Sequence, residues 1–259
     1  MLICIDAGHY MGTPGKRCMK SIDPNETREW FLNGRVADKV QKGLSIYDCQ
    51  TMRVDDPTGQ NEITMYERTT AANRAKSDVY LSIHHNAGIR GGSGGGITVY
   101  VRPGADEQSK QLQRAIYQHS IAATGLVGNR AAPMAEGNFY VLRATTMPAV
   151  LGEFGFMDST RDTPVILTEE YANQLAAGIV AALVEVYDLK EVEDVSYERW
   201  KAHMERYRDE CAQQPPSSWA KEKLEEAVQA GVTDGTRPGD LITRQEAAIM
   251  ALAAMKQEQ

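Results

Sequence analysis

Short apolar runs and longer stripes of apolar residues follow one another along most of the chain. The short runs predict six strands, at residues 2–6, 49–54, 79–83, 97–101, 139–142 and 149–154. Apolar residues repeated every three or four positions predict the intervening helices, at residues 27–42, 62–76, 106–123 and 168–187. Because strands alternate with helices, we predict an α/β fold with a twisted, mostly parallel sheet and helices on both faces.

The pattern changes after residue 190. An acidic linker at residues 191–195 precedes apolar residues at helical spacing, namely Trp200, Met204, Tyr207 and Cys211. A second helix is expected at residues 219–228, and a third begins at Thr243, which with Glu246 forms a capping-box sequence. We therefore predict one α/β domain over residues 1–190 and a small all-α module over residues 191–259.

Charge and composition narrow the range of partners. The formal net charge is −7, of which −5 is carried by residues 191–259. Since phosphate binding needs a basic face, nucleic acid is excluded as the main partner, and so is a polybasic membrane anchor. No apolar run approaches membrane-spanning length and no signal-peptide pattern opens the chain, so we expect synthesis in the cytoplasm. Four cysteines without a C-x-x-C pair are expected to be reduced thiols.

Side chains suited to metal chemistry follow the predicted strands. His84 comes directly after one of them, His9 lies just past the end of another, and Glu153 lies near the end of a third. Because such sheets bind ligands beyond the carboxyl ends of their strands, we expect a shared site there. Two imidazoles and one carboxylate, here Glu26, form a catalytic zinc arrangement when the fourth position is open. Glu153 then remains as the acid–base carboxylate, while Asp6 either orients His9 or caps the turn.

Several competing residues are expected to have other roles. His85 should point away from His84, because neighbouring side chains on a strand face opposite sides. His119 and His203 lie in predicted helices and are expected to be structural. The glycine-rich residues 91–95 match the G-x-S-x-G pattern of serine hydrolases, but a strand follows them instead of a helix, so we expect a loop.

Residues 2–188 resemble the zinc-dependent N-acetylmuramoyl-L-alanine amidases of the Amidase_3 type. The resemblance rests on residues 5–9, Glu26, residues 67–73, residues 82–87, residues 140–143 and residues 147–156. It implies that His9, Glu26 and His84 bind one zinc ion and that Glu153 is the catalytic carboxylate. The implied substrate is bacterial peptidoglycan, cleaved between N-acetylmuramic acid and L-alanine. The alternatives are an endopeptidase of the stem peptide and a wall-binding protein without activity.

Residues 217–256 resemble a single S-layer homology repeat. The resemblance implies a second partner, an anionic secondary wall polymer, with Arg244 as a contact to the anion. Because such repeats usually occur in threes, a single copy also implies self-association into a homo-oligomer. A wall amidase that lacks a signal peptide is similar to phage and prophage endolysins, which implies release to the wall through a holin-type pore.

Overall fold

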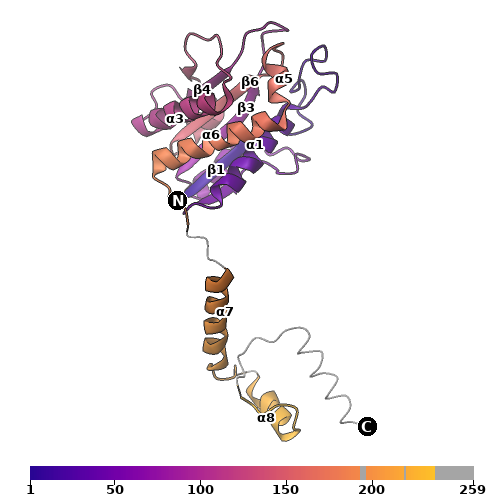
Figure 1. Cartoon of the computed structure of the whole chain (residues 1–259), viewed down its shortest axis with the longest axis vertical. Helices are drawn as coiled ribbons and strands as arrows, with labels where there is room; N and C mark the ends of the chain where they lie inside the picture. Colours follow the sequence, from indigo (N-terminus) through magenta and orange to yellow (C-terminus); the bar gives the residue numbers. More distant parts are fainter. Residues whose placement is uncertain (193–196, 219, 237–259) are drawn as a thin grey trace. The chain divides into compact units, whose positions relative to one another are not determined.

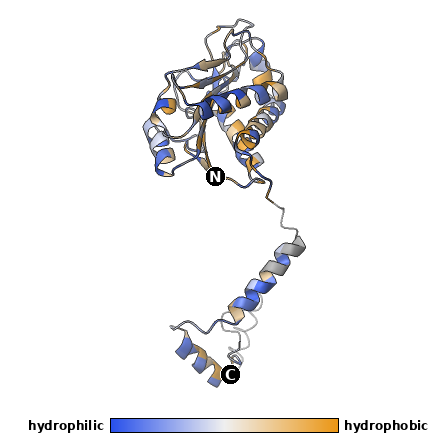
Figure 2. Cartoon of the chain, turned by 90° about the vertical axis from the view of Figure 1, so that its left-hand side faces the viewer, coloured by the Kyte–Doolittle hydropathy of each residue, from blue (hydrophilic) through white to orange (hydrophobic). Residues whose placement is uncertain are grey.

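The computed structural model describes residues 1–192, 197–218 and 220–236, and the chain divides into two units, Met1–Val192 and Glu193–Gln259 (Figure 1). In the first unit, strands and helices form an α/β fold. In the described part of the second unit, both elements are helices. Figure 2 shows that hydrophilic and hydrophobic residues both occur along the helices of the first unit.

Six strands form one sheet with the order β2-β1-β3-β6-β4-β5. Their bounds are β1 (Leu2–Ala7), β2 (Gln50–Arg53), β3 (Val79–Asn86), β4 (Ile97–Val101), β5 (Met134–Glu136) and β6 (Ala149–Phe156). All neighbouring strands are parallel except β4 and β6, which are antiparallel. The mostly parallel sheet predicted from the sequence is therefore confirmed.

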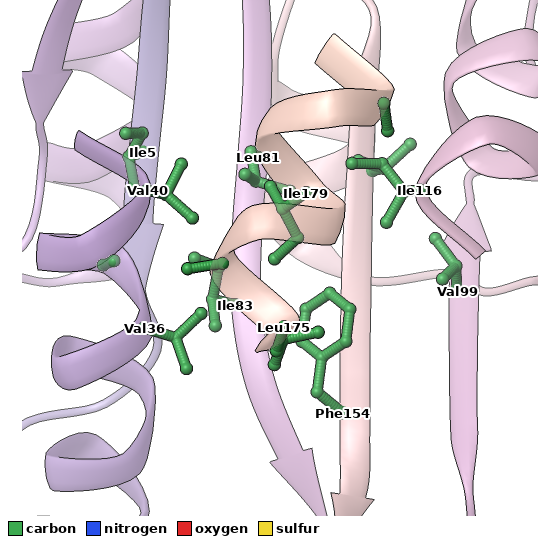
Figure 3. Close-up of a cluster of buried hydrophobic side chains, with 14 of the residues drawn as sticks. Ile5, Val36, Val40, Leu81, Ile83, Val99, Ile116, Phe154, Leu175 and Ile179 are labelled. Atoms are coloured by element: carbon green, nitrogen blue, oxygen red, sulfur yellow. The ribbon is translucent and has the colours of Figure 1, made fainter. Parts of the chain in front are cut away.

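Helices cover both faces of this sheet. One face packs against α1 (Glu29–Leu44), α3 (Glu107–Thr124) and α6 (Glu169–Tyr187), and Figure 3 shows the apolar side chains of strands and helices meeting there. The other face packs against α2 (Met65–Arg74) and α4 (Tyr140–Ala144), around the buried residues Cys4, Tyr80 and Leu151. A short helix, α5 (Asp162–Ile166), follows β6.

The predicted strand at residues 139–142 is wrong, because Phe139 is the N-cap of the short helix α4 and residues 140–142 belong to that helix. Both edges of β6 are already paired, one with β3 and the other with β4, so no edge of that strand remains for this segment. Val141 and Leu142 are instead buried in the core around Tyr80 and Leu151. A short apolar run does not by itself distinguish a strand from a buried helical turn.

The described part of the second unit contains α7 (Tyr197–Ala212) and α8 (Lys221–Gln229), as the helical spacing predicts. The third predicted helix, from Thr243, and the proposed anion contact Arg244 lie outside the described residues. Among the residues that are described, no helix is both long enough and apolar enough to cross a membrane.

Candidate metal centre

The predicted site residues of β1, β3 and β6 meet at the carboxyl ends of these strands. His84 and Glu153 are register partners in the parallel pair of β3 and β6. His9 follows β1 after Gly8, whose N–H donates to the carbonyl of Ile83 at 3.0 Å. The imidazole rings of His9 and His84 lie edge to face, with their centroids 4.9 Å apart. The structure therefore brings these three residues to the same end of the sheet.

The carboxylate between the two imidazoles is Glu29 and not Glu26. Glu29 Oε1 lies 3.0 Å from His84 Nδ1 and 3.4 Å from His9 Nε2, and the residue is 1% exposed. His9, Glu29 and His84 offer ligand atoms within 4.8 Å of one another. This grouping of two imidazoles and one carboxylate is the donor set of catalytic zinc sites.

Glu26 lies in the loop before α1, where it pairs with Arg17 at 3.2 Å and Lys20 at 3.8 Å. The assignment of Glu26 as a metal ligand is therefore corrected to Glu29. The first turn of α1 directs Glu29 toward the sheet, on the same buried side of the helix as Leu32 and Val36. The sequence held a signal for this: Glu29 lies at helical spacing from the apolar residues Leu32 and Val36, so its charged side chain falls on the buried side of the helix.

The charges of the three residues are set by one another and by burial. Burial works to raise the pKa of Glu29, but the adjacent imidazoles of His84 and His9 outweigh it and hold that pKa well below its usual value. Burial lowers the pKa of His9. Burial would also lower the pKa of His84, but the hydrogen bond with Glu29 raises it overall. An ionised carboxylate and a neutral His9 are the forms that bind metals.

The buried polar atoms at this site fit a bound cation. His9 Nε2, Glu29 Oε2 and Glu153 Oε2 are buried and have no hydrogen-bond partner among the described residues. A buried polar atom without a partner costs free energy, and each such atom in a folded protein calls for an explanation. A zinc ion bound to His9, Glu29 and His84 would satisfy two of these three atoms.

Glu153 has the properties of an acid–base group. Burial raises the pKa of its carboxyl to about 7, although the charge of His84 opposes this rise. A carboxyl group with a pKa near neutrality exchanges protons most effectively at neutral pH. Its register pairing with His84 places it beside the candidate ligands without making it one of them.

Asp6 supports the site through Arg68. The Asp6 carboxylate accepts hydrogen bonds from Arg68 at 2.6 Å and from Ser82 at 2.7 Å. Arg68 also donates to the carbonyls of Ala7 and His9, each at 2.7 Å. Asp6 therefore acts on the main chain of His9 through Arg68, and among the described residues its carboxylate makes no hydrogen bond with the His9 imidazole.

His85 faces the other side of β3 and is not part of the donor set. It is buried, and its Nδ1 lies 2.8 Å from Oδ1 of Asn33 in α1. The Asn33 amide in turn donates to the carbonyl of Gly8 at 3.0 Å. His85 and Asn33 therefore connect β3, α1 and the main chain that leads into His9.

The other competing residues are not members of the candidate donor set. His119 Nε2 lies 2.7 Å from Glu185 and links α3 to α6, while His203 belongs to α7. Residues 91–95 form the loop between β3 and β4, as predicted, and no helix follows them.

A cavity of about 550 Å³ opens next to His9 and His84. Polar side chains line part of it, among them Tyr10, Thr13, Lys16 and Glu62. Its apolar lining comes from α2, α4, β6 and adjoining residues, and includes Ile63, Met65, Phe139, Val141 and Leu151. The cavity therefore offers both polar and apolar contacts to a molecule bound next to these two histidines.

The sequence profile of the N-acetylmuramoyl-L-alanine amidase family matches residues 3–185. The chain belongs to this family. It is 32% identical to the sporulation-specific N-acetylmuramoyl-L-alanine amidase of Bacillus subtilis over 190 residues, which cover 73% of the chain and 69% of that protein. It spans about half (49%) of the amidase CwlM of Bacillus licheniformis, to which it is 31% identical.

Two further similarities bear on the context of this family member. The endolysin of Bacillus phage SPP1 is 31% identical over 196 residues, which cover 73% of this chain and 67% of the endolysin. The crystal structure of an N-acetylmuramoyl-L-alanine amidase from Clostridium difficile superposes with a TM-score of 0.65 at 30% identity, covering 72% of this chain and 96% of that one.

Proposed function

We propose that the chain is a zinc-dependent amidase that cleaves the bond between N-acetylmuramic acid and L-alanine in peptidoglycan. The observation that carries this proposal is the grouping of His9, Glu29 and His84 within 4.8 Å, with Glu153 paired beside His84. Membership of the N-acetylmuramoyl-L-alanine amidase family supports the choice of bond.

His9, Glu29 and His84 would hold the zinc ion, which would polarise the scissile carbonyl and activate a water molecule. Glu153 accepts a proton from that water as its oxygen attacks the carbonyl carbon of the lactyl group. Glu153 then returns the proton to the nitrogen of L-alanine, and the carbon–nitrogen bond breaks. The new muramoyl carboxylic acid gives up the second proton of the water, which the amine takes up at neutral pH. The products are a muramoyl carboxylate and a stem peptide with a new L-alanine amino terminus.

Mass spectrometry of purified peptidoglycan after digestion tests this choice of bond. We expect glycan chains with free lactyl carboxylates, together with stem peptides that begin at L-alanine. New amino termini within the stem peptide would indicate an endopeptidase instead. Intact peptidoglycan in the presence of zinc would favour a wall-binding protein without activity.

We further propose that the chain acts as a phage or prophage endolysin that reaches the wall through a holin-type pore. The similarity to the endolysin of Bacillus phage SPP1 supports this proposal. Co-expression with and without a holin in a bacterial host tests it: we expect rapid lysis only when both are present. Equal lysis without the holin would contradict this route.

For the second unit we propose binding to an anionic secondary wall polymer, or self-association, in support of catalysis. Its resemblance to a single S-layer homology repeat motivates both roles. The two roles are distinguished by measuring how much of the whole chain sediments with purified walls before and after the polymer is removed, together with the size of the chain in solution. Loss of sedimentation on polymer removal would support polymer binding, while a dimer or larger species in solution would support self-association.

A further inference from the structure

Lys16 lies beside the metal centre and its place is fixed by the main chain. The N–H of Glu29 donates to the carbonyl of Lys16 at 3.0 Å, and the next residue, Arg17, pairs with Arg28 in an antiparallel bridge. Lys16 Nζ lies 3.6 Å from Glu29 Oε2, and the lysine side chain is 45% exposed. Lys16 lines the same cavity as His9 and His84. A positive charge is therefore presented to whatever binds next to these two residues.

Arg68, another cation that lines this cavity, is already held by four hydrogen bonds to protein atoms. Arg68 donates to the carbonyl of Ile63 through Nε, and to Asp6, Ala7 and His9 through its terminal nitrogens. It is 4% exposed and cannot turn toward a substrate without breaking these bonds. Lys16 instead keeps donors available, because its contact with Glu29 is longer than a normal hydrogen bond.

We propose that Lys16 stabilises the negative charge that develops on the oxygen of the scissile carbonyl. This inference rests on the proposed amidase function and adds a residue to its mechanism. When water attacks, the carbonyl oxygen gains charge, and a Lys16 N–H donates a hydrogen bond to it without transferring a proton. The proton of the attacking water still travels through Glu153.

The position of Lys16 suits this task energetically. A donor directed at the developing charge acts mainly in the transition state, so it raises kcat more than it tightens substrate binding. Apolar side chains of the cavity, including Met65, Phe139 and Leu151, exclude water once a substrate is bound and strengthen the interaction.

A purely structural role for Lys16 predicts a different result. If Lys16 only neutralised Glu29, then its removal would leave a more negative metal site. Zinc would bind as tightly or more tightly, and kcat would be unchanged. Because the lysine side chain is half exposed, its replacement should not prevent folding, so both readings can be compared in folded protein.

The test compares Lys16→Met and Lys16→Arg with the matched control Lys20→Met. Lys20 is a lysine of the same loop whose side chain is 76% exposed and pairs with Glu26 at 3.8 Å. Hydrolysis of a soluble muramoyl peptide gives kcat and KM. Competition with a chelator gives zinc affinity, and inhibition by a phosphinate that mimics the tetrahedral intermediate gives a readout independent of turnover.

We expect Lys16→Met to lower kcat by about 100-fold with KM changed less than about threefold, the range found for loss of one oxyanion donor. The phosphinate should bind more weakly in proportion, Lys16→Arg should recover part of the loss, and Lys20→Met should match the wild type. Unchanged kcat in Lys16→Met, or a loss confined to KM, would overturn the inference. A wild-type enzyme that does not hydrolyse the peptide would contradict the proposed function itself.

Discussion

Glu29 stands between two imidazoles because the first turn of α1 faces the carboxyl ends of β1 and β3. Burying a carboxylate at 1% exposure would cost several kcal/mol without compensating partners. His9, His84 and Lys16 supply those partners here. The site therefore has a polar arrangement that a divalent cation would complete.

Replacing Glu29 or Glu26 with glutamine shows which of the two carboxylates binds the metal. We expect Glu29→Gln to weaken zinc binding by at least about 100-fold. Loss of a residue that only hydrogen-bonds to a metal ligand costs roughly 10- to 100-fold in affinity, and loss of a ligand itself should cost more. Glu26→Gln is the matched control and should bind zinc like the wild type, because the Glu26 carboxylate forms ion pairs with Arg17 and Lys20 in the loop before α1. Competition with a fluorescent chelator measures both. Loss of affinity in Glu26→Gln alone would contradict the corrected assignment.

The sequence allowed His9, His84 and Glu153 to be predicted because each lies at or just beyond the end of an apolar strand. The carboxylate was placed wrongly because Glu26 and Glu29 are three residues apart around a helix start. Helix periodicity distinguishes them: Glu29 continues the buried stripe of Leu32 and Val36, whereas Glu26 precedes the helix. The roles of Arg68 and Asn33 could not be predicted, because their contacts with the carbonyls of His9 and Gly8 depend on how α1, α2 and β1 pack.

At the scale of elements, β1 and β3 approach closely where the ligands emerge. A Cβ atom at Gly8 would lie 2.0 Å from Cε1 of His84, well inside contact distance. His9 itself has φ of 68°, a conformation that non-glycine residues rarely adopt. The absence of a side chain at Gly8 is therefore what lets the His84 ring lie beside His9.

Gly8→Ala should displace the ring of His84 and weaken zinc binding while leaving the sheet folded. Gly15→Ala is a suitable control, because its Cβ would meet nothing within 4 Å although its φ of +74° makes the exchange strained. We expect the control to cost about 1 kcal/mol of stability and to keep its zinc affinity. Isothermal titration with zinc and urea unfolding measure both properties. Equal zinc affinity in the two variants would contradict the close approach.

The ion pair of Asp6 and Arg68 joins β1 to α2 and makes stability depend on pH. Burial works to raise the pKa of Asp6, but the charges of Arg68 and His84 and hydrogen bonds from Ser82 and Arg68 lower it overall. A lowered folded pKa means that the stabilising contribution is complete above the unfolded value of about 3.9. It is lost as the pH falls through the lower, folded value.

Asp6→Asn should therefore reduce the free energy of unfolding by about 3 kcal/mol at pH 7, because the buried Arg68 loses its charged partner. Its stability should also fall less steeply than that of the wild type below about pH 4, where Asp6 titrates. Ser82→Ala, which removes one hydrogen bond to Asp6 but keeps the ion pair, should cost only about 1 kcal/mol. Urea unfolding at several pH values measures these differences. A variant as stable as the wild type at pH 7 would contradict this account.

Most elements of the first unit followed from hydrophobic periodicity, because each strand core and each helix stripe is buried against the sheet. The elements that periodicity did not reveal are short. The strand β5 has three residues of which two are exposed, so no apolar pattern marks it. The helix α4 has an apolar run too short to reveal its period, and tertiary packing decides its conformation.

At the scale of the whole molecule, the family match at residues 3–185 lies within the first unit, Met1–Val192. The apolar core of that unit is built from residues up to Leu189. We therefore expect a chain that ends at Val192 to fold and to hydrolyse a soluble muramoyl peptide with the kcat of the full chain. On intact walls, we expect the shortened chain to sediment less and to act more slowly.

Sedimentation with purified walls and the two hydrolysis rates measure this division of roles. If the shortened chain bound walls as well as the full chain, the second unit would have no part in targeting. If it failed to hydrolyse the soluble peptide although it was folded, the second unit would be required for catalysis.

The most direct test of the central claim is a zinc titration of metal-free protein with hydrolysis of a muramoyl peptide as the readout. We predict no release of L-alanine amino termini without metal, a linear rise as zinc is added, and a plateau at one zinc per chain. Glu153→Gln should bind one zinc with unchanged affinity and release no product, because it cannot accept the proton of the attacking water. Full activity in the metal-free protein, or an active Glu153→Gln variant, would contradict the account.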